Sequence, residues 1–454
     1  MKAGRVLPAI TVGAGLWVVL VSAAGAAMSW LGWWTPYVAW PVALVLAALS
    51  AWCVRAVPAV RGAGPASAGV LVLVVAVFTV WVGATHSEQV LPRRDAASNV
   101  QAAVSLATTG QRVVSVDPES LGGSAVLDDR VTLGSPAFYA EGSSREPSVQ
   151  PQFVIGPAVV YSFGWWLGGG TAAMLVPALA MGLALLALGL LTARVVGAWW
   201  GVVAAALVAV VFPVVHTARA TYSEPLAMLT VAGGLLALTL VAGVKRADEG
   251  VTPDVLARIA LVAGVLLGGT GFVRVDALRE VVLVVPVLCL GAALGSRWVR
   301  PLATGLGISL AAAALAAVAL SYRYLGDIAD SLVPLVALAV LVCGVCGGLL
   351  VLWDRGHRMP ERVAVALPNA VAAVTVLLGL YLASRPLWQV VRQDPNDPGA
   401  RYVAGMQARQ GLAIDGGRTY AEHTVTWLAW YVGPVALLVA LVALAALLRH
   451  AVLR

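Results

Sequence analysis

Long apolar runs separated by short charged clusters constrain the fold of this chain more than any other feature of its sequence. The runs are about 17 to 24 residues long, the length that a helix needs to cross roughly 30 Å of hydrocarbon. Of the 454 residues, 60% are apolar and only 11% are charged, and the mean hydropathy is +0.90. A soluble domain would need far more polar surface, so the sequence excludes one large water-soluble core.

We therefore predict an all-α polytopic membrane protein with about 12 transmembrane helices. The expected spans are 6–28, 36–54, 68–84, 170–193, 198–215, 225–243, 256–273, 277–295, 302–321, 332–353, 363–384 and 426–448.

The distribution of Lys and Arg predicts how these spans are oriented. Basic residues resist transfer across a membrane and collect in short cytoplasmic connections. With the amino terminus inside, the expected cytoplasmic segments carry far more basic than acidic residues, whereas the opposite segments are slightly acidic. We therefore expect a multi-pass protein of the cytoplasmic membrane with both ends inside. The basic balance then reflects topology and anionic lipid, and gives no reason to propose nucleic acid as a partner.

Small residues within the spans are interpreted as packing positions. All four cysteines lie in or at the edge of spans, so no disulfide framework is predicted, and Cys343 and Cys346 fit a close helix contact better than a redox or metal pair. The same interpretation covers the glycine clusters at 264–271 and 344–348. Cleavage of the first span as a signal peptide stays open, because basic residues precede it.

Two connections are long enough to hold structure, and both lie on the expected extracytoplasmic face: residues 85–152 and 385–425. In the first, Asp95 is placed to cap a short amphipathic helix on the membrane surface. The apolar positions of that helix recur at helical spacing at Val100, Ala103, Val104 and Ala107. On these residues alone, the simpler interpretation is that Asp95 only caps the helix.

The stretch from Arg94-Asp95 to Thr109-Gly110 resembles the start of the first extracytoplasmic loop in the GT-C superfamily of integral membrane glycosyltransferases. This superfamily contains protein mannosyltransferases, which form glycosyltransferase family 39, and aminoarabinose transferases. Further similar segments follow in the same order at 153–157, 168–171, 219–225, 264–276 and 420–434. Each is weak alone, and the resemblance depends on their shared order and topology.

The resemblance implies a GT-C-like fold with a partly helical first extracytoplasmic loop. It assigns residues 68–300, including the loop 85–152, to a catalytic core. Residues 1–67 would then add a peripheral pair of transmembrane helices. Residues 301–454 would add the C-terminal transmembrane helices together with the loop 385–425.

Enzymes of this superfamily move a sugar from a polyprenyl-phosphate carrier to an acceptor hydroxyl on the outer face of the membrane. The resemblance therefore implies a polyprenyl-phosphate-sugar-dependent glycosyltransferase, a hexosyl- or pentosyltransferase of cell-envelope biogenesis. Its partners would be the lipid-linked donor, membrane lipids, and a glycan, lipid or protein acceptor. Asp95 would be the catalytic carboxylate, a base beside the acceptor oxygen. The sugar, the acceptor and the stereochemical outcome stay open.

Positive charge is also required, because the leaving group departs as a phosphate dianion. Arginines at outer span ends are candidates for this role, although snorkelling toward headgroups explains each of them equally well. These candidates are Arg219, Arg274 and Arg323, followed by Arg93 and Arg94.

Two acidic residues at outer span ends, Glu224 and Asp276, are candidates for a second acidic group. A structural ion pair explains them at least as well, Glu224 with Arg219 or Asp276 with its neighbour Arg274. Some GT-C members hold a divalent metal such as Mg or Mn between acidic residues of two outer loops, which would here join Asp95 to one of these two. Other members need none, so metal dependence stays open.

Two further functions stay open. A transporter or lipid flippase would usually carry ionisable residues at mid-membrane and paired repeats with broken helices, and the sequence shows neither. A catalytically inactive GT-C homologue is kept open by Asn99, which stands where many members have an aromatic residue. His216 is expected to be an interfacial histidine rather than a metal ligand.

Overall fold

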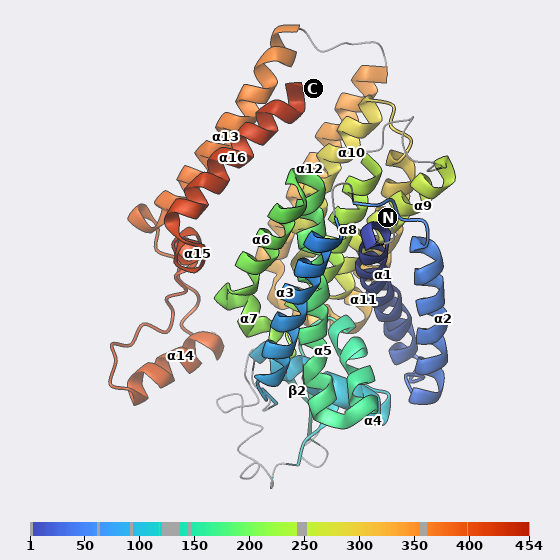
Figure 1. Cartoon of the computed structure of the whole chain (residues 1–454). Helices are drawn as coiled ribbons and strands as arrows, with labels where there is room; N and C mark the ends of the chain where they lie inside the picture. Colours follow the sequence, from blue (N-terminus) through green and yellow to red (C-terminus); the bar gives the residue numbers. More distant parts are fainter. Residues whose placement is uncertain are drawn as a thin grey trace. The chain divides into compact units, whose positions relative to one another are not determined.

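The computed structural model describes residues 3–60, 64–90, 94–117, 119, 137–142, 147–242, 252–354, 361–396 and 398–453. They form two compact units: unit 1 is Met1–Val210 with Val214–Gly348, and unit 2 is Val211–Pro213 with Leu349–Arg454. Helices dominate both (Figure 1). The predicted all-α polytopic class is therefore confirmed, while the unit boundary does not coincide with the divisions expected at residues 67 and 300.

Unit 1 contains most of the helices and a small sheet. Its elements in chain order are α1 (Ala3–Trp30), α2 (Pro36–Val54), α3 (Pro65–Ala84), α4 (Arg94–Thr109), β1 (Val114–Ser115), β2 (Phe138–Gly142), β3 (Pro147–Pro151), α5 (Gly156–Val196), α6 (Ala198–Ala209), α7 (Phe212–Ala218), α8 (Glu224–Ala242), α9 (Pro253–Gly269), η4 (Thr270–Phe272), η5 (Val275–Ala277), α10 (Leu278–Ala293), α11 (Val299–Asp327) and α12 (Ala329–Asp354). The first two residues of α7 and the end of α12 belong to unit 2.

Unit 2 is built from α13 (Glu361–Trp388), α14 (Pro398–Arg409), η6 (Ala421–His423), α15 (Thr424–Val432) and α16 (Pro434–Leu453). The long helices α13 and α16 pack against each other. In the part of the chain that connects these two helices, the buried Glu422 accepts hydrogen bonds from the backbone N–H of Val391, at 3.1 Å, and from Arg418. These bonds tie the start and the end of the connection between α13 and α15 together.

In the part of the chain that the structure describes, fewer helices are long and apolar enough to span a membrane than the expected number of about 12. Among the described residues, nine helices are long and apolar enough to cross a membrane, or up to 11 if each of two bent pairs, α6–α7 and α15–α16, is one span. The remaining expected span corresponds to α10, whose 16 residues are fewer than the roughly 20 that a span needs. The structure supports a multi-pass membrane protein, and the count of 12 is not reproduced.

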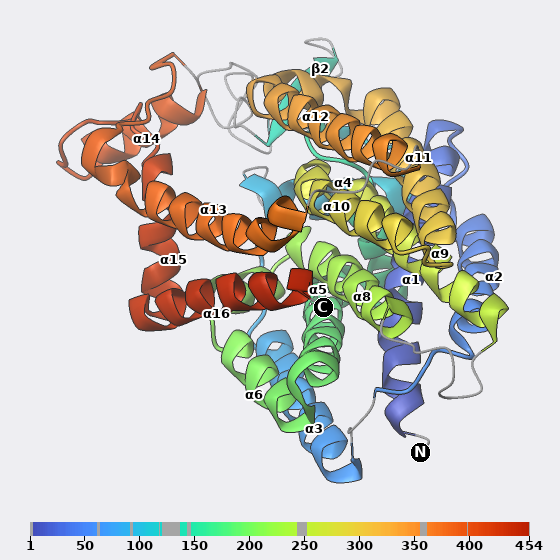
Figure 2. The same ribbon diagram turned by 90° about the horizontal axis from the view of Figure 1, so that it is seen from above.

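The first helix lies in the core of unit 1 rather than at its edge. α1 packs against α5 and α8 as well as α2, and Val12 and Val21 are fully buried. Figure 2 shows α1 among these helices, with α2 outside it. The two helices that were expected to form a peripheral pair therefore differ in position. α2 lies on the outside of α1, and α1 is part of the core of unit 1.

Close contact between α9 and α11 depends on glycine. A Cβ on Gly264 would lie 2.1 Å from the carbonyl oxygen of Leu302, and a Cβ on Gly305 would lie 2.3 Å from that of Leu261. Only glycine allows the two backbones to approach this closely. The predicted packing role of the cluster at 264–271 is confirmed. That of 344–348 is not, because Gly344, Gly347 and Gly348 meet no atom within 4 Å in the described part of the chain.

α5 contains a sharp break that the sequence analysis did not predict. Gly168 and Gly169 have non-helical backbone angles, with φ of 64° at Gly169. The segment before the break folds against the segment after it, since a Cβ on Gly164 would lie 2.6 Å from Cα of Ala173. The expected span 170–193 is thus only the second part of α5.

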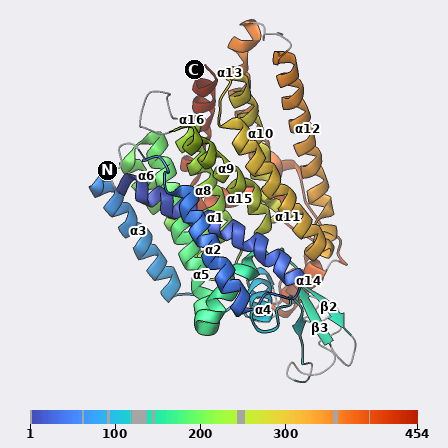
Figure 3. The same ribbon diagram turned by 90° about the vertical axis from the view of Figure 1, so that its right-hand side faces the viewer.

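α4 and the sheet lie at one end of unit 1, which we call the loop end (Figure 3). The break in α5 also belongs to this end, because Trp166 donates a hydrogen bond of 3.0 Å to the carbonyl of Ala107 in α4. The strands pair antiparallel in the order β1-β3-β2. α4 is amphipathic as predicted, with Ala103 and Leu106 fully buried. It begins at Arg94, so Asp95 lies in its first turn instead of capping it.

Substituting Gly264 by Val is expected to destabilise unit 1. The added side chain would collide with the backbone of α11, and overpacking of this kind costs about 1–3 kcal/mol. The midpoint of thermal unfolding of the detergent-solubilised protein should fall. Gly347→Val is the matched control in α12 and should leave the midpoint nearly unchanged. Equal effects of the two substitutions would contradict the packing argument.

Candidate functional site

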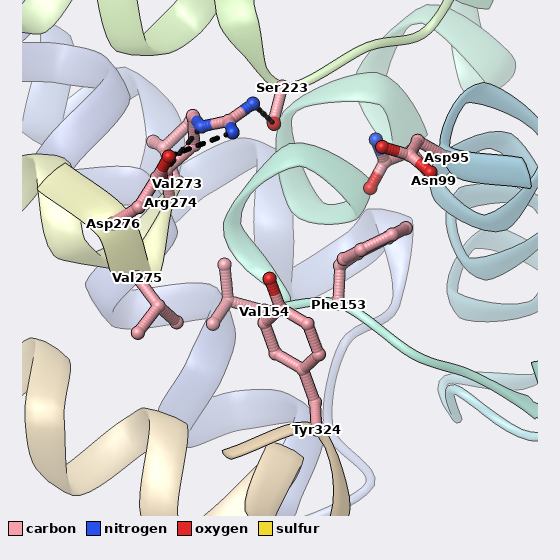
Figure 4. Close-up of a pocket in the computed structure, with 10 residues that line it drawn as sticks. All are labelled: Asp95, Asn99, Phe153, Val154, Ser223, Val273, Arg274, Val275, Asp276 and Tyr324. Atoms are coloured by element: carbon pink, nitrogen blue, oxygen red, sulfur yellow. Dashed lines mark hydrogen bonds and ion pairs between the residues drawn. The ribbon is translucent and has the colours of Figure 1, made fainter. Parts of the chain in front are cut away.

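A pocket at the loop end collects residues from five separate segments of unit 1. Its volume is about 390 Å³, including its mouth open to solvent. α4 contributes two residues, the segment between β3 and α5 two, the segment before α8 one, the η4–η5 region four and α11 one. In that order they are Asp95, Asn99, Phe153, Val154, Ser223, Val273, Arg274, Val275, Asp276 and Tyr324 (Figure 4).

Arg274 forms the polar side of the pocket together with two carboxylates. Its Nε and Nη2 donate to the two carboxylate oxygens of Asp276, at 2.8 and 3.1 Å. Its Nη1 lies 2.5 Å from Oε1 of Glu224 and 3.2 Å from the hydroxyl of Ser223. The predicted pair between Asp276 and Arg274 is confirmed. Glu224 also pairs with Arg274, whereas the sequence analysis had suggested Arg219.

This ion cluster shifts the pKa of both of its central members. Burial alone would raise the pKa of Asp276, but the hydrogen bonds and the charge of Arg274 outweigh it and hold that pKa below its usual value. Burial alone would lower the pKa of Arg274, and its two carboxylate partners instead hold it above the usual range. Arg279, 3.8 Å from Asp276, adds a weaker attraction. Asp276 and Arg274 are therefore both charged at neutral pH.

α4 forms the opposite side of the pocket. The side-chain amide of the buried Asn99 donates to the carbonyl of Thr221 at 2.8 Å, and the hydroxyl of Thr221 donates to the carbonyl of Ala96 at 2.6 Å. These two bonds fix α4 to the segment that precedes α8. They also give Asn99 a structural role that an aromatic residue could not perform. Asp95 lies one turn before Asn99, at the solvent-exposed edge of the pocket.

Aromatic side chains form the wall between these two polar sides. The rings of Phe153 and Tyr324 meet edge to face, with centroids 5.3 Å apart. The hydroxyl of Tyr324 points into the space between Asp95 and Arg274 (Figure 4). It lies near enough to the charges of Asp95, Glu224, Arg274 and Asp276 to interact with all four.

Acidic side chains outnumber the guanidinium of Arg274 at this site. Glu224 and Asp276 accept hydrogen bonds from two edges of that guanidinium, and Asp95 lines the pocket from the opposite side. A phosphate would therefore have to displace Glu224 or Asp276 in order to bind Arg274. Among the described residues, no group of three His, Cys, Asp or Glu side chains is arranged to hold a metal ion.

The other candidates lie outside this pocket lining. Arg219 donates from its Nε to the carbonyl of Thr85. Arg323 pairs with Glu141 at 2.9 Å. Nε2 of His216 lies 3.2 Å from the hydroxyl of Tyr222. Arg93 and the side chain of Arg94 lie outside the described residues.

The sequence analysis missed the aromatic wall of the site. Tyr324 follows an apolar run and stands beside Arg323, and the basic residue was the only signal considered there. Phe153 was recognised only as part of a segment that resembles a family. Comparisons of the chain with protein-family models, with curated proteins and with solved structures found no match.

Asp276→Asn is expected to remove a pH-dependent part of the stability. Because the pKa of Asp276 is lower in the folded protein than its unfolded value of about 3.9, its ion pair stabilises above that value and is lost as pH falls through the folded pKa. The unfolding midpoint of wild type should exceed that of the variant at pH 7, and the difference should shrink below about pH 4.

Glu88→Gln, at an exposed position outside the pocket lining, is the control for this measurement. Its midpoint should follow that of wild type throughout the titration. A constant difference between wild type and Asp276→Asn from pH 7 to the acid limit would contradict the assignment.

Proposed function

We propose that this chain is a membrane glycosyltransferase that moves a sugar from a polyprenyl-phosphate carrier to an acceptor hydroxyl. One observation carries the proposal. Four segments far apart in sequence, 94–110, 153–157, 219–225 and 264–276, each resemble GT-C glycosyltransferases, and all four contribute to the lining of one pocket.

Asp95 is the proposed catalytic base. It stands at the start of an amphipathic helix, exposed, at the mouth of a pocket beside apolar helices, where a lipid-linked sugar and a water-borne acceptor could meet. In the proposed step the acceptor oxygen forms a bond to the anomeric carbon, and the bond from that carbon to the phosphate oxygen breaks. The acceptor proton passes to Asp95, and the polyprenyl phosphate leaves as a dianion. The stereochemical outcome stays open.

Arg274 is better explained as a residue that orders the pocket than as a phosphate ligand. Its bidentate bond to Asp276 and its contact with Glu224 fix the η4–η5 region against the start of α8. We therefore place the donor phosphate at the rim of the pocket, near the start of α4. Arg94, in the turn that also carries Asp95, is the candidate there.

Asp95→Asn should reduce sugar transfer by about 10²–10⁴-fold, because it removes the base and keeps the shape of the side chain. The measurement is transfer from radiolabelled polyprenyl-phosphate sugars, tested as a panel, by the purified protein in lipid nanodiscs. Parallel reactions with Mg, with Mn and with a chelator decide metal dependence.

Glu88→Gln is again the matched control, since it removes an exposed carboxylate outside the pocket lining. It should transfer sugar at the wild-type rate. An Asp95→Asn protein that is as active as Glu88→Gln, with an unchanged unfolding midpoint, would disprove the role of Asp95.

A transporter or lipid flippase is the second candidate, and the structure gives it one specific support. Helix breaks occur in α5 at Gly168 and Gly169 and in α11 at Ser321, and discontinuous helices are common in transporters. Both breaks lie at the loop end, however, and transporters place them near mid-membrane, so we rank this function second. Proteoliposomes separate the two: a flippase moves the lipid-linked sugar between leaflets intact, whereas a transferase converts it to the free carrier.

A further inference from the structure

Arg112 is a buried arginine that joins two segments far apart in sequence. It follows α4, and its side chain is only 8% exposed. One terminal nitrogen donates to the carbonyls of Pro151 and Phe153, at 2.5 and 2.6 Å. The other donates to the carbonyl of Leu320 and the hydroxyl of Ser321, at 2.5 and 3.0 Å. The two terminal nitrogens thus face different segments: one faces the end of β3 and the residues after it, and the other faces the last third of α11.

The contacts with α11 fall at its break. Ser321 has non-helical backbone angles, φ −140° and ψ 31°, which interrupt the regular pattern of helical hydrogen bonds. Carbonyls at such a break need another donor, because an unsatisfied buried carbonyl costs about 1–3 kcal/mol. Arg112 supplies that donor to Leu320. The hydroxyl of Ser321 in turn donates to the carbonyl of Phe153 at 3.2 Å, which closes the bridge between the segments.

The bridged residues lead directly into the aromatic wall of the pocket. The carbonyl of Phe153 accepts a hydrogen bond from Arg112. Tyr324 lies three residues after the break at Ser321, in the last part of α11. Their rings are in edge-to-face contact and both line the pocket. A shift of either bridged segment would therefore change the distance between this wall and Asp95.

Arg112 remains charged while it does this. Burial lowers its pKa to about 10, so it is protonated at neutral pH and keeps all of its donors. The bonds above engage four of the five N–H groups of Arg112. The fifth, on Nε, has no hydrogen-bond partner among the described residues. Lysine would keep the charge but has a single donor atom, which cannot face both segments in the fixed fork that a guanidinium offers.

We propose that Arg112 is the positioning residue of the pocket: its two terminal nitrogens hold the end of β3 and the break in α11 together, and so set the place of Phe153 and Tyr324. The geometric part of this inference is independent of the reaction. The consequence for substrate, that the aromatic wall limits the space open to a sugar ring beside Asp95, rests on the proposed function.

Amide hydrogen exchange of the full-length protein in nanodiscs tests the geometric part. Arg112→Met should speed exchange in residues 147–155 and 318–327 and leave residues 226–241 of α8 unchanged. Ser321→Ala, the milder variant, removes one acceptor of Arg112 and the bond to Phe153, and should speed exchange in the same two segments to a smaller extent. Tyr324→Phe keeps the ring contact and should exchange like wild type.

Each other outcome of this experiment contradicts the proposal. Faster exchange throughout the chain would show that Arg112 stabilises the fold in general. Faster exchange in 147–155 alone would show that it does not couple the two segments. Wild-type exchange in an Arg112→Lys protein would show that charge is sufficient and that the fork is not needed.

A kinetic measurement tests the consequence for substrate and keeps it distinguishable from the proposed function. In the transfer assay, Arg112→Lys should raise KM for the lipid-linked donor about tenfold while kcat changes less than about twofold. An equal fall in kcat with unchanged KM would overturn the positioning role. If the wild-type protein transfers no sugar, the proposed function fails, and the exchange experiment still decides the role of Arg112.

Discussion

Satisfying backbone hydrogen bonds inside a bilayer is the constraint on which this structure depends. A chain that is 60% apolar has to place most of its backbone in lipid, and only helices satisfy the polar groups there without help. Every departure from a helix then needs a partner from elsewhere. At the break in α11 that partner is Arg112, which donates to the carbonyl of Leu320. The breaks in α5 and α11 both lie at the loop end, where polar side chains are available, and the pocket forms at the same end.

The same constraint explains why the charges of the pocket are paired. A carboxylate at the edge of the hydrocarbon is costly unless a cation accompanies it, and Arg274 accompanies Asp276 and Glu224 at once. Asp95 stands apart from this cluster at the exposed edge. Two carboxylates, those of Asp276 and Glu224, thus hold the scaffold through Arg274, whereas Asp95 is exposed at the mouth of the pocket. This division of roles is what makes Asp95 the preferred catalytic candidate.

Glycine decides how closely the helices that carry the pocket can pack. At Gly264 and Gly305 the backbones of α9 and α11 nearly touch, which brings the end of η4 and the later part of α11 to the same site. Glycines of similar spacing at 344–348 meet nothing within 4 Å in the described residues. A small-residue pattern therefore permits close packing without specifying it, because the partner surface has to be supplied by another helix.

The sequence by itself determined the features that depend on neighbours along the chain. These are the apolar helices, the amphipathic α4, and the pair of Arg274 with Asp276, two residues apart. Only the tertiary structure decided that Glu224 pairs with Arg274 instead of Arg219, that α1 lies in the core, that α5 and α11 break, and that Tyr324 and Arg112 serve the pocket. The physical reason is range: hydropathy and local spacing fix which segments are helical, whereas the partners of a buried charge or a broken helix come from residues up to about two hundred positions away, and no local pattern encodes which of them will be close.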